Sequence, residues 1–273
     1  MRALSKLALV FLLVTFSLTS AFGRRPLPQL DPTGACDYVI VTPTKLAASF
    51  QPLADWKSER GVRTRIVPLE RINKLYPSGD GAKSIRYFLK EAYRVWGIKW
   101  VLLGGDITDI DGNPLVPCRM AVATVKSAEQ MPADLYFSSL DGAWDSNNNG
   151  VYGEVTDQVD LEPEVFVGRA PVRTADEVAA FVDKLMTYEK HPIEGLTRRG
   201  LWIGAALDET TPGKDVITAI IKEAKVPKDI DNKILCTKDG TLNADALCTE
   251  INEYLPHTVF FAAHGSPDLI ALD

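Results

Sequence analysis

Short apolar segments alternate with amphipathic ones along most of this 273-residue chain, and this alternation restricts its fold more than any other feature. Residues 37–42, 62–68, 100–104 and 164–168 have the length and the aliphatic or β-branched content of buried strands. Residues 83–96 instead carry apolar side chains at helical spacing. Strands that alternate with helices are joined by crossovers, so the sequence predicts an α/β fold of largely parallel sheets flanked by helices.

The alternation of predicted strands and helices is interrupted near residue 191 and then resumes. Residues 44–60 are a predicted helix that Gly61 ends, and residues 174–189 are another, with Thr174 and Glu177 as a capping box. A linker at 191–195 follows. Beyond it we expect strands at 199–204, 233–236 and 258–263, and helices at 213–224 and 243–254. The prediction is two consecutive α/β subdomains, 37–190 and 196–273, of which the second is truncated.

The first residues have the pattern of a secretory signal peptide. A basic start is followed by an apolar run from Leu7 to Leu18 and by small residues at a cleavage site, which assigns residues 1–23 to the signal and 24–36 to a Pro-rich lead. An uncleaved anchor is the alternative, but the run is shorter than the ~20 residues that span a bilayer. We therefore expect a secreted, cell-surface or periplasmic protein with no stable membrane span after cleavage.

The net charge and the cysteine spacing restrict the binding partners and metal sites that the sequence predicts. The formal net charge of −6 and the lack of a lysine or arginine stripe argue against a nucleic-acid partner. The four cysteines, Cys36, Cys118, Cys236 and Cys248, have no metal-type spacing. In an oxidising compartment they can pair, but small buried apolar residues are an equally good interpretation of each.

A loop with regularly spaced oxygen-bearing residues is typical of a calcium site. Gly150 allows a sharp turn at its centre, as in the first half of a D-x-N-x-N-G calcium loop. Thr156 stands at the twelfth position, where an EF-hand has glutamate, so Glu154 or Asp157 would have to complete the shell. A plain Asn-Gly turn between strands is the alternative. The predicted ligands of a structural Ca²⁺ are Asp145, Asn147, Asn149, Val151 and Glu154.

The tail places a histidine and a glycine after an apolar strand. Residues 258–263 lead into His264 and Gly265, where a central strand would reach the carboxyl edge of a sheet. Open α/β folds bind their ligands at that edge. From these residues alone, a histidine satisfied by local hydrogen bonds at a strand end is the favoured interpretation of His264.

Eight segments, taken in order, resemble the gingipain family of secreted cysteine peptidases, which have a caspase-like fold. The resemblance covers nearly the whole chain after the signal segment. The segments are Tyr38-Val-Ile-Val-Thr-Pro43, Leu53-Ala-Asp-Trp-Lys57 with Gly61-Val62, Val101-Leu-Leu-Gly-Gly-Asp106, Ala133-Asp-Leu-Tyr136, Leu140-Asp-Gly-Ala-Trp-Asp145, Glu164-Val-Phe-Val-Gly-Arg169, Lys184 to Glu189, and Ala263-His-Gly265.

This resemblance implies a cysteine endopeptidase that acts on protein or peptide substrates. It makes His264 the general acid and base, and makes the Gly265 N–H a donor to the oxyanion. The family's nucleophile is a cysteine in an Ala-Cys motif after the next strand, and no position up to Asp273 matches it. Cys236 and Cys248 are poor substitutes. We therefore expect a fragment that is inactive as given.

Asp134 matches an aspartate in the specificity pocket of the arginine-specific members, although the residues around it differ. The resemblance therefore implies a preference for a basic residue before the scissile bond. A turn aspartate that caps backbone N–H groups is the alternative. Two other functions also remain open: a non-catalytic caspase-like binding or assembly module, and a transpeptidase that acts on exported proteins.

Overall fold

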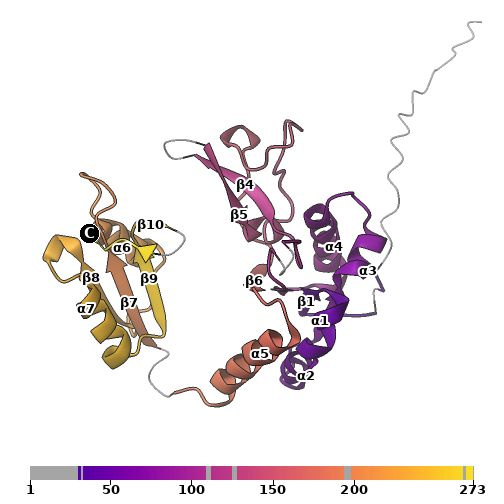
Figure 1. The fold of residues 1–273 in the computed structure, drawn as a ribbon, viewed down its shortest axis with the longest axis horizontal. Coiled ribbons are helices and arrows are strands. Elements are labelled where there is room, and N and C mark those ends of the chain that lie inside the picture. The colour runs from indigo at the N-terminus through magenta and orange to yellow at the C-terminus, as the bar shows by residue number, and fades with distance from the viewer. Residues whose placement is uncertain are drawn as a thin grey trace, which may run out of the picture. The chain divides into compact units, whose positions relative to one another are not determined.

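A computed structural model of the protein describes residues 30–31, 33–108, 112–124, 128–193, 198–266 and 269–272. The predicted signal peptide and residues 24–29 of the predicted lead lie outside these ranges. The chain forms two compact units, Met1–Met186 and Thr187–Asp273, and each is described here by itself (Figure 1). Within the described ranges, no helix is both long and apolar enough to cross a membrane.

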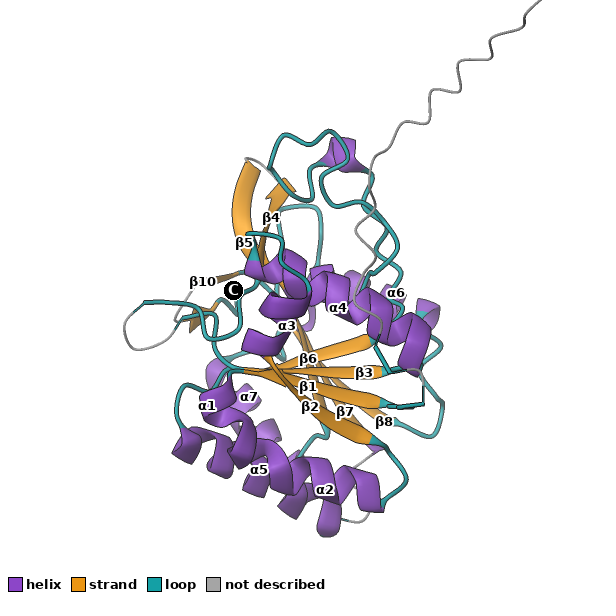
Figure 2. Ribbon diagram, turned by 90° about the vertical axis from the view of Figure 1, so that its right-hand side faces the viewer, coloured by secondary structure: helices purple, strands orange, loops and turns teal. Residues whose placement is uncertain are grey.

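The first unit is built on a four-stranded parallel sheet, as predicted. Its strands are β1 (Tyr38–Thr42), β2 (Thr64–Pro68), β3 (Trp100–Gly104) and β6 (Phe166–Ala170), in the order β2-β1-β3-β6. Helices α2 (Gln51–Glu59) and α5 (Ala175–Lys190) cover one face, and α3 (Leu69–Leu75) and α4 (Gly81–Trp96) cover the other (Figure 2). Both faces of a parallel sheet are buried in this way, which explains why β1 and β3 are almost continuously apolar.

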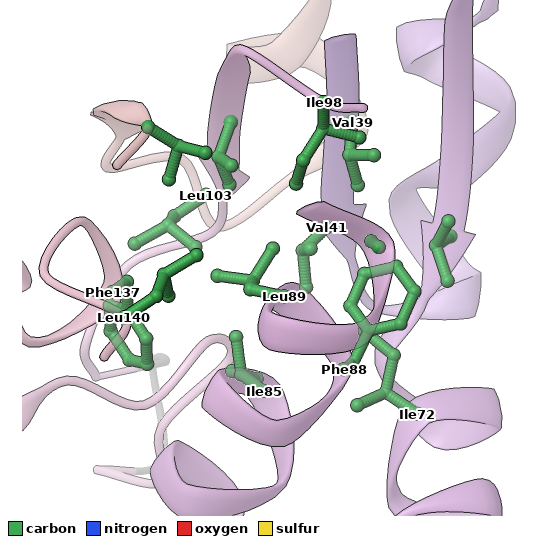
Figure 3. Close-up of a cluster of buried hydrophobic side chains, with 14 of the residues drawn as sticks. Val39, Val41, Ile72, Ile85, Phe88, Leu89, Ile98, Leu103, Phe137 and Leu140 are labelled. Atoms are coloured by element: carbon green, nitrogen blue, oxygen red, sulfur yellow. The ribbon is translucent and has the colours of Figure 1, made fainter. Parts of the chain in front are cut away.

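Helix α4 shows how local signals set an element and its buried face. The Asp80 side chain accepts a hydrogen bond from the Lys83 N–H (3.0 Å) at its start, and Gly97 adopts φ 73° at its end. Between these caps, Ile85, Phe88 and Leu89 pack against the sheet (Figure 3). Burying a side chain of this size stabilises the fold by ~1.5–3 kcal/mol relative to leaving it exposed.

The prediction of one continuous helix over residues 44–60 is wrong in one respect, because a 3₁₀ turn interrupts the helix. It consists of α1 (Thr44–Ala47), a 3₁₀ turn (Ala48–Phe50) and then α2. Pro52 lacks the N–H that a continuous helix would use and lies instead in the first turn of α2. The elements of this unit that were not predicted include α3 and an antiparallel hairpin of β4 (Arg119–Thr124) with β5 (Ala128–Ala133).

The second unit has a three-stranded parallel sheet in the order β8-β7-β9. Its strands are β7 (Arg199–Gly204), β8 (Asp231–Cys236) and β9 (Thr258–Ala262), and its helices are α6 (Gly213–Glu223) and α7 (Ala244–Thr249). The expectation of β9 as a buried central strand is wrong for the described residues. Strand β9 borders β7 alone, and Val259 and Phe261 are 37% and 36% exposed.

Candidate active site

His264 lies just beyond the carboxyl end of β9. Its strand is held in place by β7, where Gly204 pairs with Ala262 and the Ala205 N–H donates to the Ala262 carbonyl (3.0 Å). The His264 side chain is exposed, and its Nε2 lies 2.5 Å from the Leu207 carbonyl oxygen. A carbonyl can only accept, so Nε2 carries the hydrogen and Nδ1 is the basic nitrogen. Nδ1 has no hydrogen-bond partner in the described ranges.

The loop that supplies the Leu207 carbonyl is itself held firmly. The Leu207 N–H donates to Thr211 O (3.0 Å), and the Asp208 carboxylate accepts from the backbone and hydroxyl of Thr210 (2.7 and 2.8 Å). These bonds, the Thr210 N–H foremost, lower the pKa of Asp208 to about 2. At the end of the loop, a Cβ on Gly213 would lie 2.2 Å from a backbone oxygen, so only glycine fits. The carbonyl that orients the His264 imidazole is therefore well positioned.

The structure thus gives His264 an orienting partner that the sequence did not reveal. The sequence pattern indicates no acidic residue for this role. A backbone carbonyl carries no signature in a sequence, because every residue has one. The partner also lies 57 positions away along the chain.

Gly265 begins the short hairpin of β10 (Gly265–Ser266) and β11 (Leu269–Ile270). The Ala271 N–H donates to the His264 carbonyl (2.8 Å), which makes Gly265 and Ile270 a non-hydrogen-bonded pair. The N–H of Gly265 is therefore not used by the hairpin ladder. A side chain at this position would press against the Leu269 carbonyl, 3.3 Å from an added Cβ.

Cys236 ends β8 at the same edge of the sheet as His264, but the central strand separates them. Gly204 of β7 pairs with Cys236 on one side and with Ala262 on the other. At ~4.8 Å between adjacent strands, the backbones of Cys236 and Ala262 lie ~10 Å apart. The Cys236 side chain is also fully buried. It is therefore poorly placed to act as the nucleophile beside His264.

The other cysteines are no better suited. All four cysteines are described and free, so the structure holds no disulfide. Burial raises the pKa of the Cys36 and Cys118 thiols, which disfavours the reactive thiolate. Cys248 is exposed on α7. Buried Cys36 and Cys236 fit the interpretation as small apolar residues.

Asp134 belongs to the first unit, where it lies at the start of a 3₁₀ turn (Asp134–Phe137). Its two carboxylate oxygens accept from Nε and Nη2 of Arg169, both at 2.7 Å. The Arg169 Nη1 also donates to the carbonyls of Gly105 and Val116, each at 2.7 Å. Asp134 therefore binds a guanidinium group, as predicted for a specificity pocket, but this group belongs to Arg169 of the same chain. The sequence alone did not indicate this pairing.

The residues predicted to bind calcium lie together in the first unit. Asp145 accepts from the N–H groups of Asn149 (2.9 Å) and Gly150 (3.1 Å), and the Asn147 side-chain oxygen also accepts from Asn149 N–H (3.0 Å). The Glu154 carboxylate faces the side-chain amide of Asn149 (2.6 Å). Positive φ at Gly150 (81°) permits the turn. Four of the five predicted ligands thus gather their side chains in one loop.

Two further contacts fix the base of this loop. The buried Asp157 carboxylate accepts from the N–H groups of Ser146 (2.9 Å) and Glu154 (3.1 Å). The Val151 N–H donates to the Asn149 side-chain oxygen (2.8 Å). Asp157 is thus buried below the loop, whereas the Glu154 carboxylate lies beside the Asn149 side chain, which leaves Glu154 as the better candidate to complete a cation shell. The alternative of a turn between strands is not what the structure shows, since no strand adjoins either end of the loop in the described ranges.

Comparison with known proteins decides the family. The sequence profile of peptidase family C25 matches residues 31–272, which is most of the chain. The chain belongs to peptidase family C25. The resemblance found in the sequence is therefore confirmed.

Relatives within the C25 family are considerably longer. Gingipain R2 of Porphyromonas gingivalis is 26% identical over 171 residues, which are 62% of this chain but 18% of that protein. Gingipain R1 of the same species is also 26% identical over 171 residues, which are 14% of its length. This C25 chain therefore matches less than a fifth of the length of either relative.

Solved structures confirm the predicted fold class. The complex of Porphyromonas gingivalis RgpB pro- and mature domains aligns with a TM-score of 0.51 at 19% identity, over 79% of this chain and 45% of that one. A structure described as that of a protease aligns with a TM-score of 0.56 at 15% identity, over 89% and 48% of the two chains. At these identities the alignments show a shared α/β fold with parallel sheets flanked by helices.

Proposed function

We propose that this C25 chain is part of a cysteine endopeptidase in which His264 is the general acid and base. The observation that carries the proposal is the orientation of its ring. Nε2 donates to the Leu207 carbonyl, which leaves Nδ1 of the exposed His264 as the basic nitrogen, without a hydrogen-bond partner in the described ranges. A carbonyl that accepts from Nε2–H also stabilises the imidazolium that forms when Nδ1 takes a proton.

The proposed reaction begins when Nδ1 of His264 takes the thiol proton of the nucleophile. The thiolate attacks the peptide carbonyl, and the N–H of Gly265 donates to the oxyanion that develops. As the intermediate collapses, the C–N bond breaks and the imidazolium gives its proton to the leaving amine. Water, deprotonated by His264, then hydrolyses the thioester and regenerates the thiol.

The nucleophile is proposed to come from outside the 273 residues. The support is the position of the four cysteines, none of which presents an exposed thiol at the β9 edge in the described ranges. By itself the chain is then proposed to lack peptidase activity. Its substrate would be a protein or peptide, and its compartment the cell exterior or periplasm, as the pattern of residues 1–23 indicates.

Alkylation with an arginyl chloromethyl ketone tests both the proposed origin of the nucleophile and the role of His264. In the protein isolated from its host, we expect one modified cysteine that is none of the four in this chain, and labelling lost on His264→Ala. His257→Ala is the matched control and is expected to label normally. Modification of Cys236 or Cys248, or unchanged labelling of His264→Ala, would refute the proposal in favour of a non-catalytic module or a different nucleophile.

A preference for a basic residue before the scissile bond is proposed to rest on Asp134. Its carboxylate already binds the Arg169 guanidinium and is still 31% exposed, and a carboxylate offers about four acceptor sites. Because Arg169 balances its charge, the preference should be modest. The test uses the protein isolated from its host, in which Asp134→Asn should reduce the ratio of kcat/KM for an arginyl substrate to that for a leucyl substrate several-fold. An unchanged ratio would remove Asp134 from substrate binding.

Calcium is proposed to stabilise the loop that begins at Asp145. The support is the gathering of Asp145, Asn147, Asn149 and Glu154 side chains, which are the oxygen donors that Ca²⁺ prefers over softer metals. The Val151 carbonyl is proposed as a further ligand. Calcium at 100 times its dissociation constant would stabilise the folded chain by ~2.7 kcal/mol. The test is the unfolding temperature with and without chelator, and Asp145→Ala, in which chelator should change nothing, is the control. If chelator does not change the unfolding temperature of the wild type either, the calcium site is refuted.

A further inference from the structure

Two adjoining hollows lie along α4 in the first unit. The first has a volume of about 360 Å³ and the second of about 450 Å³, and Lys90 and Asp141 belong to the lining of both. Small-molecule sites in proteins usually measure ~300–1,000 Å³, so each hollow has room for a ligand group. We call the two hollows together the α4 groove.

The charged side chains that line the α4 groove balance one another. The cations are Lys83, Arg86, Lys90 and Arg94, and the carboxylates are Glu91, Asp141, Asp145 and Glu164. Burial lowers the pKa of Lys90, and the charges of Asp141 and Glu164 act in the opposite direction. An ion that enters such a lining meets repulsion as well as attraction, and it also loses its hydration shell. The lining therefore favours a neutral polar ligand.

Lys90 and Asp141 offer a donor and an acceptor at the point where the two hollows meet. Asp141 is exposed and acts on the charge of Lys90, yet their side chains form neither an ion pair nor a hydrogen bond with each other in the described ranges. The Arg86 guanidinium, by contrast, is held by the carbonyls of Ser139 (2.6 Å) and Gly142 (2.9 Å). A hydroxyl both donates and accepts, so one ligand hydroxyl between Lys90 and Asp141 satisfies the two groups together.

Each hollow also contains an exposed tyrosine of α4. Tyr87 lines the first and is 36% exposed, and Tyr93 lines the second and is 44% exposed. The apolar face of such a ring packs well against the C–H groups of a pyranose ring. Six residues of a helix rise by ~9 Å, which is further than one pyranose ring extends. A ligand that reaches both tyrosines therefore needs two linked rings.

We propose that the α4 groove binds the terminal disaccharide of a neutral glycan, with one ring on Tyr87, the next on Tyr93, and a hydroxyl between Lys90 and Asp141. The ligand is bound through its ring faces and hydroxyls and carries no charge. This binding needs neither His264 nor a nucleophile, so its test is independent of the proposed peptidase activity.

The test is an NMR titration of the 273-residue chain with four neutral disaccharides, namely cellobiose, maltose, lactose and N,N′-diacetylchitobiose. We expect at least one of them to bind. Its monosaccharide should bind at least ~10-fold more weakly, because a single ring leaves one hollow empty. The proposal is overturned if none of the four binds, or if the monosaccharide binds as tightly as the disaccharide.

The methyl glycoside of the same disaccharide represents a glycan attached through its reducing end. It should bind as tightly as the free sugar, because the proposed contacts are made by ring faces and hydroxyls. A methyl glycoside that fails to bind would overturn the assignment to the end of a glycan.

A charged counterpart of the same disaccharide tests the balance of charge in the groove. When a carboxylate replaces the terminal CH₂OH group, the affinity should fall several-fold, because the charge must be desolvated without a net attraction. The affinity for the neutral disaccharide should not change as salt rises, since screening acts on charged ligands. Tighter binding of the charged counterpart, with an affinity that falls as salt rises, would overturn the proposal in favour of an ionic ligand.

Variants locate the binding. Lys90→Met removes a charged donor and should weaken the disaccharide ~10-fold. Tyr93→Ala removes the ring of the second hollow and should weaken it several-fold, and the exposure of Tyr93 keeps the effect on folding small. Lys74→Met, on the exposed surface of α3, is the matched control and should leave the affinity unchanged. Binding that neither Lys90→Met nor Tyr93→Ala weakens would overturn the site.

Discussion

Strands β3 and β9 are both five residues long and equally apolar, Trp-Val-Leu-Leu-Gly and Thr-Val-Phe-Phe-Ala, yet they are buried to different degrees. Strand β3 lies between β1 and β6, with helices on both faces, and its last four residues are buried. Strand β9 borders only β7, and only Ala262 is buried. The burial of a strand is therefore set by its neighbours and not by its composition.

The same contrast holds for the two units. In the first unit, two apolar clusters fill both faces of the sheet, and ion pairs such as that between Asp134 and Arg169 connect its loops to the strands. In the second, the well-buried strand is β7, and exposed apolar side chains include Val259, Phe261 and Leu269. We infer that the first unit, taken alone, is the more stable.

The largest expected effect on stability comes from breaking the ion pair between Arg169 and Asp134. Arg169→Met in the first unit should reduce the free energy of unfolding by about 3 kcal/mol, because it leaves Asp134 and two carbonyls without their donor. The control is Arg198→Met in the second unit, whose pair with Asp229 is 66% and 58% exposed, and the cost there should be about 0–0.5 kcal/mol. Urea unfolding measures both. Similar losses would break the contrast between the units.

A smaller effect is expected from matched valines in the two compared strands. Val101→Ala in β3, where the side chain is 2% exposed, should cost about 2 kcal/mol through lost burial and the cavity left behind. Val259→Ala in β9, 37% exposed, should cost less than about 1 kcal/mol. Hydrogen exchange should show the loss confined to the unit that carries the change. An equal cost at Val259 would mean that β9 is covered in solution.

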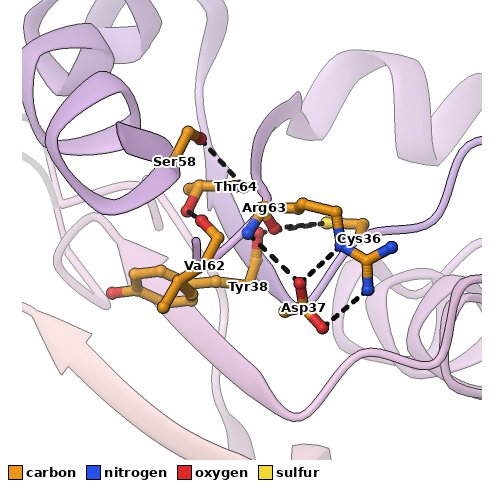
Figure 4. A network of polar contacts seen from close by, with 7 residues as sticks. All are labelled: Cys36, Asp37, Tyr38, Ser58, Val62, Arg63 and Thr64. Carbon is orange, nitrogen blue, oxygen red and sulfur yellow. Dashed lines mark hydrogen bonds and ion pairs between the residues drawn. The ribbon is translucent and has the colours of Figure 1, made fainter. Parts of the chain in front are cut away.

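The smallest effect is the pH dependence of one ion pair in the first unit. Nε and Nη2 of Arg63 donate to the Asp37 carboxylate (2.6 and 2.9 Å), beside Cys36 (Figure 4). The Arg63 guanidinium lowers the pKa of Asp37 below its ordinary value. The pair therefore stabilises the fold above the unfolded-state pKa, near ~3.9, and this contribution is lost as pH falls through the lower folded-state value.

The corresponding measurement is the unfolding free energy of wild type and Asp37→Asn between pH 5 and pH 2. The difference between them should be below about 1 kcal/mol at pH 5 and should shrink as the solution becomes more acid. High salt should reduce it as well. A difference that grows towards low pH has the opposite sign and would contradict the assignment.

The sequence by itself determined the elements whose causes are local. The strands predicted at 100–104 and 199–204 have those limits in the structure. The cap at Thr174 was half right: its hydroxyl accepts from the Glu177 N–H (3.2 Å), but the Glu177 carboxylate accepts from Arg173 N instead of closing the box. Periodicity and capping depend on residues within a turn or two of each other, so a sequence shows them directly.

Only the tertiary structure decided the contacts between distant residues. Leu207 lies 57 positions from His264, and Arg169 lies 35 from Asp134. Strand β9 has the composition of a buried strand, and its exposure follows from which strands border it. The Arg86 guanidinium of α4 likewise donates to the Ser139 carbonyl, 53 positions further on. Such pairings depend on the path of the chain through space, for which neither residue type nor local spacing carries a signal.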